Sequence, residues 1–352
     1  MSEFFSSKFA ALTPYTPGEQ PQDRRYIKLN TNESPFPPSD LAVKMAREEA
    51  EKLQLYSDPE CRSLHQAAAE ILGFSEEELI FTNGSDEILN FAFMAFCDPD
   101  HPAAFPDITY GFYPVFAKLN GVPYREIPLL GDFTIDEADY IGTAETLFLA
   151  NPNAPTGIAL PLSVIEEIVR SNPKRIVVVD EAYADFSEES AAPLVRKYRN
   201  LLVTQTFSKS RSLAGARLGI GIACPELIRD LQTIRYSTNP YNVNRMTMAA
   251  GVGALLDTAY FEENIRKIKQ TREETSAALQ KLGFTVLPSQ TNFVFARHDR
   301  IGGEELYRFL KEKGILVRHF SLPRIRDWNR ITIGSDQEMQ TLIQVLSEMR
   351  RS

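Results

Sequence analysis

The segment with the clearest capacity for chemistry is residues 204–219, TQTFSKSRSLAGARLG, which follows an apolar run that predicts a buried strand. It places Lys209 among hydroxyl-bearing and small residues, although lysine is normally a solvated surface residue. Thr206, Ser208 and Arg217 supply hydroxyls and a guanidinium, the groups that bind a phosphate. A lysine shielded beside a bound phosphate is suited to imine formation with a carbonyl cofactor. Taken alone, the segment is equally compatible with an exposed, serine-rich loop.

A second candidate site follows the strand predicted over residues 78–81, because ligands collect at the carboxyl ends of parallel strands. Residues 82–87, TNGSDE, open a strongly apolar helix. Gly84 permits a tight turn, and Ser85 is the expected N-cap residue. The backbone N–H groups of Ser85 and Asp86 would then form a phosphate seat at the positive end of the helix. An ordinary capped helix is the alternative for this stretch alone.

Further candidates lie at the ends of other predicted strands. Asp180 ends a fully apolar strand, where an unpaired carboxylate is costly, and a cationic ring nitrogen would be a suitable partner. Tyr183 could donate a hydrogen bond to a phenolate-like oxygen, and Tyr110 could stack on a planar ring. Arg330 could clamp a substrate carboxylate. The alternatives are a helix cap for Asp180, core packing for Tyr110 and a solvated strand end for Arg330.

Together, a lysine, an aspartate, a phosphate seat, a stacking ring and a carboxylate clamp are the groups that pyridoxal-phosphate chemistry requires. The pyridoxal aldehyde would form an imine with Lys209. Asp180 would keep the pyridine nitrogen protonated, so that the ring draws electrons from the substrate Cα. An incoming amino acid would displace Lys209, which would then move a proton between Cα and the cofactor carbon.

The elements that must position these groups alternate along the chain. Short apolar strands separated by helices between residues 79 and 203 predict a mostly parallel sheet covered by helices on both faces. A long charged helix over residues 259–282 and shorter strands after it predict a smaller α+β domain. We expect an N-terminal arm over residues 1–28, a large cofactor-binding domain over 45–245, and a small domain formed by 29–44 with 246–352.

Composition narrows the class of protein. The 352 residues carry a net charge of −9 without a long basic run, which argues against nucleic acid or an anionic membrane as partner. Three widely spaced cysteines indicate a reducing compartment rather than a disulfide framework. Four histidines without ligand spacing predict no structural metal. The start of the chain lacks a signal-peptide pattern and no apolar run reaches membrane-spanning length, so we expect a cytoplasmic protein.

The whole set of motifs resembles the fold-type I, pyridoxal-phosphate-dependent aminotransferases of the class II subgroup, and most closely the histidinol-phosphate aminotransferase family. The motifs run in order over nearly the whole chain: 12–15 LTPY, 29–33 LNTNE, 56–61 YSDPEC, 83–87 NGSDE, 110–113 YGFY, 153–157 NAPTG, 180–183 DEAY, 206–209 TFSK, 213–217 LAGAR and 330–334 RITIG. The resemblance implies an α/β fold with large and small domains, pyridoxal 5'-phosphate as cofactor, and a homodimer with shared active sites.

The resemblance also implies roles for single residues. Lys209 would be the Schiff-base lysine, Asp180 the partner of the pyridine nitrogen, and Tyr183 the neighbour of the ring oxygen. The expected cofactor-binding residues are Gly84, Ser85, Asp86, Tyr110, Asn153, Asp180, Tyr183, Thr206, Ser208, Lys209 and Arg217. The expected substrate-binding residues are Tyr15, Asn32, Tyr56, Arg318 and Arg330. Arg330 would take the substrate carboxylate, and Tyr56 would reach the substrate phosphate from the neighbouring subunit.

One position departs from the family pattern. The family usually carries asparagine directly before the proline of the 153–157 motif, where it bonds the ring oxygen, but this chain has Ala154 there. Either Asn153 takes over through a shifted turn or Tyr183 serves that oxygen alone. We predict that Asn153 substitutes.

The implied activity is amino transfer between L-histidinol phosphate and 2-oxoglutarate, giving imidazole acetol phosphate and L-glutamate in histidine biosynthesis. A threonine-phosphate decarboxylase and an aromatic amino-acid aminotransferase are alternatives on the same fold, and a non-catalytic pyridoxal-phosphate-binding regulator is an alternative of another class. A nicotinamide-dependent oxidoreductase is disfavoured, because Gly219-Ile-Gly221 lacks the third glycine of the dinucleotide-binding motif and is better interpreted as a strand.

Overall fold

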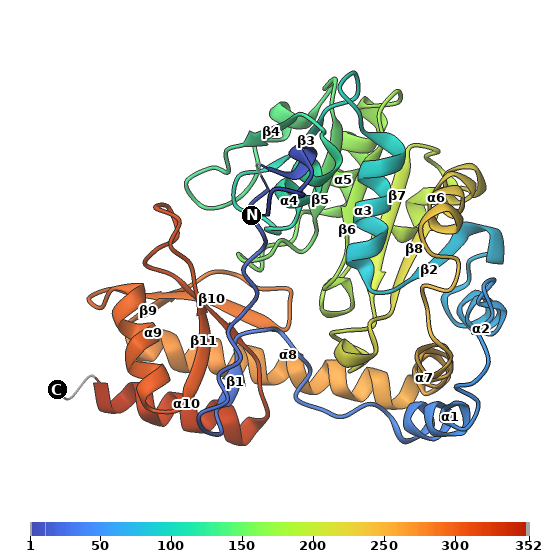
Figure 1. Ribbon diagram of the computed structural model, residues 1–352. Helices are drawn as coiled ribbons and strands as arrows, with labels where there is room; N and C mark the ends of the chain where they lie inside the picture. Colours follow the sequence, from blue (N-terminus) through green and yellow to red (C-terminus); the bar gives the residue numbers. More distant parts are fainter. Residues whose placement is uncertain (1, 11, 350–352) are drawn as a thin grey trace.

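The computed structural model describes residues 2–10 and 12–349, which form two sheet-based domains side by side (Figure 1). The larger sheet has the strand order β2-β8-β7-β6-β5-β3-β4. Its strands are β2 (Leu79–Thr82), β3 (Ala103–Pro106), β4 (Tyr124–Ile127), β5 (Thr146–Ala150), β6 (Val177–Asp180), β7 (Leu201–Thr206) and β8 (Gly219–Ala223). Only β8 runs antiparallel to its neighbours, β2 and β7. The predicted, mostly parallel sheet is confirmed, and so is the strand that contains Gly219-Ile-Gly221.

Helices cover both faces of this sheet, because its central strands are apolar on both sides. In β6, Val178 packs into one apolar cluster, whereas Val177 and Val179 pack into the other, as the two-residue period of a strand requires. The helices on the Val178 face are α3 (Ser85–Phe96), α4 (Tyr113–Asn120) and α6 (Pro225–Thr238). Those on the opposite face are α1 (Asp40–Ala50), α2 (Arg62–Leu72), α5 (Leu162–Ser171) and α7 (Arg245–Leu256).

The smaller sheet has the order β1-β11-β12-β10-β9. Its strands are β1 (Ile27–Leu29), β9 (Phe284–Val286), β10 (Phe293–His298), β11 (Ile315–His319) and β12 (Asn329–Thr332). The helices α8 (Thr258–Lys281), α9 (Gly303–Glu312) and α10 (Asp336–Met349) pack with these strands in one apolar cluster. That cluster also takes in Ala154 and Tyr183, so the two domains share a core beside the loops that follow β5 and β6.

Short 3-10 helices lie in the connecting segments: η1 (Ser7–Phe9), η2 (Glu76–Glu78), η3 (Glu137–Tyr140), η4 (Ala184–Phe186), η5 (Ala192–Arg196) and η6 (Ala214–Ala216). In the part of the chain that the structure describes, no helix combines the length and the apolar character needed to span a membrane.

The packing places some segments differently from the boundaries expected from sequence. β1 pairs in parallel with β11 and therefore joins the small sheet rather than a free arm. α1 and α7 both bury apolar residues in a core of the large domain, with Ala42 packed directly against Gly253. We therefore propose that residues 40–44 and 246–256 belong to the large domain and that residues 27–28 belong to the small one.

Candidate active site

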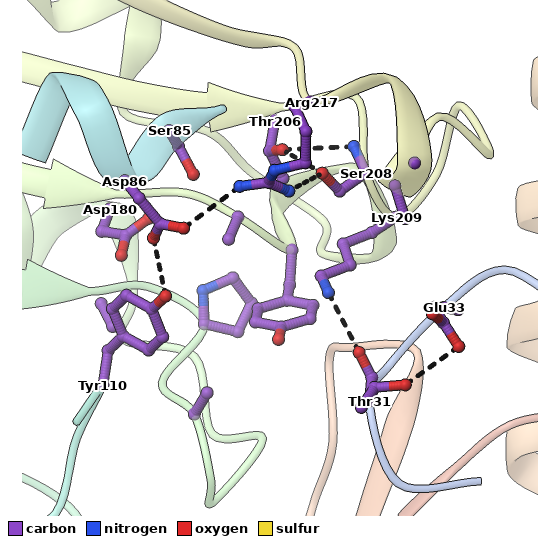
Figure 2. Close-up of a pocket in the computed structure, with 17 residues that line it drawn as sticks. Thr31, Glu33, Ser85, Asp86, Tyr110, Asp180, Thr206, Ser208, Lys209 and Arg217 are labelled. Carbon is purple, nitrogen blue, oxygen red and sulfur yellow. Dashed lines mark hydrogen bonds and ion pairs between the residues drawn. The ribbon is translucent and has the colours of Figure 1, made fainter. Parts of the chain in front are cut away.

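A cavity of about 310 Å³ opens at the carboxyl ends of β5, β6 and β7, where the parallel strands terminate at one edge of the sheet (Figure 2). Most of the predicted cofactor-binding residues line it together: Ser85, Asp86, Tyr110, Asp180, Tyr183, Thr206, Ser208, Lys209 and Arg217. Thr31 and Glu33, from the segment after β1, also line it, and no role was predicted for either. Both residues lie inside the 29–33 LNTNE motif, and this position could have indicated that they belong to the site.

Lys209 lies in the loop after β7 and extends into the cavity (Figure 2). Its Nζ donates a hydrogen bond to the backbone carbonyl of Thr31 at 3.3 Å and lies 5.9 Å from the centre of the Tyr183 ring. Burial, reinforced by the positive charge of Arg330, lowers the pKa of Lys209 to about 8. A neutral amine, the nucleophilic form, is therefore accessible near physiological pH.

Asp180 is the last residue of β6, and its side chain is buried. Oδ2 accepts a hydrogen bond from the Tyr113 hydroxyl at 2.9 Å, and Oδ1 accepts one from Thr204 Oγ1 at 3.3 Å. Burial raises the pKa of Asp180 to about 6, and the bond from Tyr113 opposes that rise. The role expected for Asp180, as the partner of a cationic ring nitrogen, stays a prediction. Tyr113 lies in the 110–113 motif, but the sequence assigned it no role.

The residues of the predicted phosphate seat lie at the N-terminus of α3, and the structure corrects the expected cap. Gly84, with φ of 80°, is the N-cap residue, and Ser85 is the first residue of the helix and not its cap. Position 84 also favours glycine, because a Cβ there would lie 2.5 Å from Nη2 of Arg217. Position 219 on β8 also favours glycine, since a Cβ there would lie 2.4 Å from the backbone nitrogen of Ser85.

Arg217 closes the seat from the opposite side. Its guanidinium donates to Asp86 Oδ2 at 3.2 Å and to Ser208 Oγ at 3.4 Å, while Thr206 Oγ1 donates to Ser208 Oγ at 3.0 Å. The first turn of α3, two hydroxyls and a guanidinium therefore lie at one end of the cavity, where Figure 2 shows Ser85, Thr206, Ser208 and Arg217. Such a set of donors, with two glycines keeping side chains out, fits a phosphate group.

Tyr110 flanks the cavity, and its hydroxyl donates to Asp86 Oδ1 at 2.6 Å (Figure 2). Burial raises the pKa of Tyr110 well above its ordinary value, so the phenol stays protonated. Its ring meets the Tyr113 ring edge to face, at 5.7 Å between centres. The side chain of Tyr110 lines the cavity, and the stacking role expected for it stays a prediction.

Asn153 does not line this cavity, although it precedes Ala154, which does. Its amide nitrogen donates to the Ile108 carbonyl and to Thr156 Oγ1, both at 3.0 Å, and its amide oxygen accepts from Thr109 Oγ1 at 2.8 Å. The side chain is thus committed to stabilising its own turn. The prediction that Asn153 replaces the family asparagine conflicts with this geometry, and Tyr183 remains the candidate partner of a ring oxygen.

A second cavity, of about 510 Å³, adjoins the first and shares Tyr110, Tyr183 and Lys209 with it. The predicted substrate-binding residues Tyr15, Asn32, Arg318 and Arg330 line it. Arg330 donates to the Asn30 carbonyl at 3.1 Å and lies over the rings of Phe293 and Phe320. Its buried Nε has no hydrogen-bond partner among the described residues, so a donor remains available for an anionic ligand.

The other predicted substrate residues differ in how they are held. Tyr15 stacks on Phe112 at 4.2 Å between ring centres, and Arg318 donates to the carbonyls of Thr16 and Pro17. Tyr56 lies outside both cavities: it is 81% exposed and stacks on Tyr241 at 4.7 Å. One chain by itself therefore does not bring Tyr56 to the site.

Similarity to known proteins agrees with this geometry. Residues 24–346 match the family model "Aminotransferase class I and II". The chain is 48% identical to histidinol-phosphate aminotransferase of Brachyspira hyodysenteriae, over 98% of both chains. It is 47% identical to histidinol-phosphate aminotransferase 1 of Bradyrhizobium diazoefficiens, over 99% of this chain and 100% of that one.

Solved structures give the same result. The histidinol-phosphate aminotransferase of Sinorhizobium meliloti in complex with pyridoxal-5'-phosphate superposes with a TM-score of 0.91 at 26% identity, covering 100% of this chain and 98% of that one. The L-threonine-O-3-phosphate decarboxylase of Porphyromonas gingivalis gives a TM-score of 0.81 at 23% identity, covering 93% of this chain and 100% of that one, a likeness of fold alone. The predicted fold and family are therefore confirmed, and the chain belongs to the histidinol-phosphate aminotransferase family of class I and II aminotransferases.

Proposed function

We propose that this protein transfers an amino group between L-histidinol phosphate and 2-oxoglutarate with pyridoxal 5'-phosphate as cofactor, giving imidazole acetol phosphate and L-glutamate in histidine biosynthesis. The observation that carries the proposal is a half-buried lysine amine and a buried carboxylate, Lys209 and Asp180, lining one cavity with a proposed phosphate seat. Relatives that are 47–48% identical over nearly the whole chain carry the name histidinol-phosphate aminotransferase, which supports this substrate.

The cavity fits pyridoxal phosphate at each of its ends. The first turn of α3, Thr206, Ser208 and Arg217 would hold the phosphate, and Asp180 would hold a proton on the ring nitrogen. Tyr110 would lie against the ring, and the Tyr183 hydroxyl would serve the ring oxygen. When bound, the cofactor supplies a ring that withdraws electrons from the substrate Cα.

Lys209 would act twice in the reaction. Its lowered pKa of about 8 makes the neutral amine available for covalent attachment to the cofactor carbonyl carbon. Once an incoming amino group has displaced it, the freed amine would take the proton from the substrate Cα and deliver it to the former carbonyl carbon of the cofactor. Asp180, whose charge is stabilised by Tyr113 and Thr204, keeps the ring nitrogen protonated throughout.

The second cavity would hold the remainder of the substrate. The free Nε of Arg330 would bind a carboxylate of 2-oxoglutarate or L-glutamate. Tyr15 and Arg318 would approach the phosphate of L-histidinol phosphate. We assign Tyr56 to the phosphate site of a neighbouring subunit, in a homodimer with shared sites, because its exposed aromatic ring lies outside both cavities of its own chain.

We place the protein in the cytoplasm, since its three cysteines are free thiols.

The test begins with the cofactor. Protein purified with pyridoxal phosphate should be yellow, and borohydride should fix the cofactor to Lys209, as seen by peptide mass. Lys209→Ala should give no such adduct. The loaded enzyme should then convert L-histidinol phosphate and 2-oxoglutarate to L-glutamate. Release of carbon dioxide from L-threonine phosphate, or faster turnover of phenylalanine or tyrosine, would contradict the substrate assignment. A protein that binds the cofactor without turnover would be a regulator.

A further inference from the structure

The side chain of Asn32 makes two hydrogen bonds inside the protein, and one of them ends at Tyr183. Its Nδ2 donates to the Tyr183 hydroxyl at 2.8 Å, and its Oδ1 accepts from Thr332 Oγ1 at 3.0 Å. Thr332 Oγ1 in turn accepts from the backbone N–H of Asn32 at 3.0 Å. These partners lie 151 and 300 positions away along the sequence, so the arrangement is built by the tertiary fold.

This arrangement determines where the Tyr183 phenol hydrogen goes. A phenol oxygen has one hydrogen to donate and accepts through its lone pairs. Because the Asn32 amide is itself a donor, it satisfies the phenol oxygen as an acceptor and cannot receive the phenol hydrogen. That hydrogen is therefore free to be directed at an acceptor in the cavity that Tyr183 lines.

Several residues of the cavity wall near Tyr183 have side chains that cannot replace the Tyr183 hydroxyl as a hydrogen-bond donor. Ala154 packs in the same apolar cluster as Tyr183, and the other lining residues from the ends of β5 and β6 include Ala150, Pro152 and Ala182. None of these four carries a hydrogen-bonding side chain. The Asn153 side chain bonds within its own loop, and position 154, directly before Pro155, is alanine. The direction of the Tyr183 phenol hydrogen therefore matters more here than in a chain with asparagine before that proline.

Asn32 is held tightly enough to impose that direction. It is 1% exposed and has φ of 57°, a left-handed conformation that asparagine tolerates better than most residues. Its carbonyl accepts from Asn292 Nδ2 at 2.9 Å, and Thr332 belongs to β12 of the small domain. The orientation of Tyr183, in the large domain, therefore depends on the docked small domain.

We propose that Asn32 is a positioning residue that acts through Tyr183: its amide turns the phenol hydrogen into the cavity, so that Tyr183 alone serves the ring oxygen of the cofactor in a chain with alanine at position 154. This replaces the substrate-binding role predicted for Asn32, and it rests on the proposed function only in requiring that pyridoxal phosphate binds. Loss of the contact should weaken a hydrogen bond to the ionised ring oxygen, while the substrate contacts of Arg330 remain.

The test is the pH titration of the visible absorption of the bound cofactor. A donor to the ionised form lowers the titration midpoint, so Tyr183→Phe should raise it by about one pH unit. Asn32→Gly, which removes the amide, adds no charge and accepts the positive φ, should raise it by part of that shift. In the double variant the midpoint should equal that of Tyr183→Phe, since the proposed effect of Asn32 passes through Tyr183.

Asn329→Ala is the matched control. Asn329 is a fully buried asparagine of β12 whose amide donates to the Gly303 carbonyl, and it lines neither cavity. It should lower the melting temperature and leave the midpoint unchanged. An unchanged midpoint in Asn32→Gly, or a shift of equal size in the Tyr183→Phe background, would overturn the positioning role. Absence of any cofactor absorption in the unmodified protein would instead overturn the proposed function.

Discussion

The Tyr113 hydroxyl donates a hydrogen bond of 2.9 Å to Oδ2 of Asp180, joining the first residue of α4 to the last residue of β6 in a fully buried contact. This bond lowers the pKa of Asp180 against the burial that raises it to about 6. Tyr113 thereby helps to keep the carboxylate charged where the cofactor nitrogen is proposed to lie.

Tyr113→Phe should therefore raise the pKa of Asp180 further, by about one unit, because a hydrogen bond to the ionised form is lost. The acid limb of cofactor binding should move to higher pH by the same amount. Cofactor dissociation constants measured between pH 5 and 9 would show it. Tyr124→Phe is the control, since Tyr124 also packs against Phe105 but is not among the hydrogen-bond donors to Asp180. Equal shifts in both variants would contradict the role of Tyr113.

Gly219→Ala should weaken the phosphate seat, because the added Cβ would lie 2.4 Å from the Ser85 nitrogen and 2.5 Å from the Gly84 carbonyl carbon. Overpacking of this kind typically costs about 1–3 kcal/mol and would displace the N-terminus of α3. Pyridoxal phosphate should bind at least about tenfold more weakly. Gly131→Ala, whose Cβ would meet no atom within 4 Å, should leave both binding and melting temperature unchanged.

The raised pKa of Glu181 predicts that the stability of the protein depends on pH. It accepts hydrogen bonds from Ser190 Oγ and the Ala191 N–H, both at 2.6 Å, and from Gln205 Nε2 at 2.9 Å, yet burial raises its pKa from 4.5 to about 7. The folded state then binds this proton more tightly than the unfolded state. Its contribution to stability is greatest below pH 4.5 and is lost as the pH rises to 7.

Glu181→Gln removes this titration. Relative to the unmodified protein, the variant should gain stability between pH 5 and 8, by up to about 3 kcal/mol. Urea unfolding of the cofactor-free protein at several pH values measures the difference. The exposed Glu188→Gln should show no such trend. A difference that stays constant with pH would mean that Glu181 is ionised throughout.

Tyr56 and Lys209 provide a test of shared active sites. If Tyr56 serves the partner's site, Tyr56→Ala and Lys209→Ala should each have low activity at limiting substrate, but an equal mixture should regain activity after subunit exchange. Random pairing makes half of the dimers hybrid, each with one intact site, so the mixture should approach about one quarter of normal activity. Activity that stays at the mean of the two separate variants would exclude sharing.

The sequence by itself was sufficient for the features that depend on local pattern. Apolar strands alternating with helices predicted the parallel sheet, and the ends of those strands predicted where Asp180, Lys209 and Arg217 would converge. Helix α7 was missed, because it is apolar nearly all round and carries little helical periodicity; it is buried on several sides at once.

Tertiary structure alone decided which hydrogen bonds the polar side chains make. The N-cap of α3 is Gly84 and not Ser85, and a side chain at position 84 would meet Arg217, which lies far away in sequence. Asn153 turns away from the cavity because Ile108 and Thr109 offer its amide partners, and Asn32 meets Tyr183 because β12 holds it there. The hydrophobic pattern depends on residues that are close in sequence. The hydrogen-bond partner of a buried polar group is often distant in sequence and is brought near only by folding.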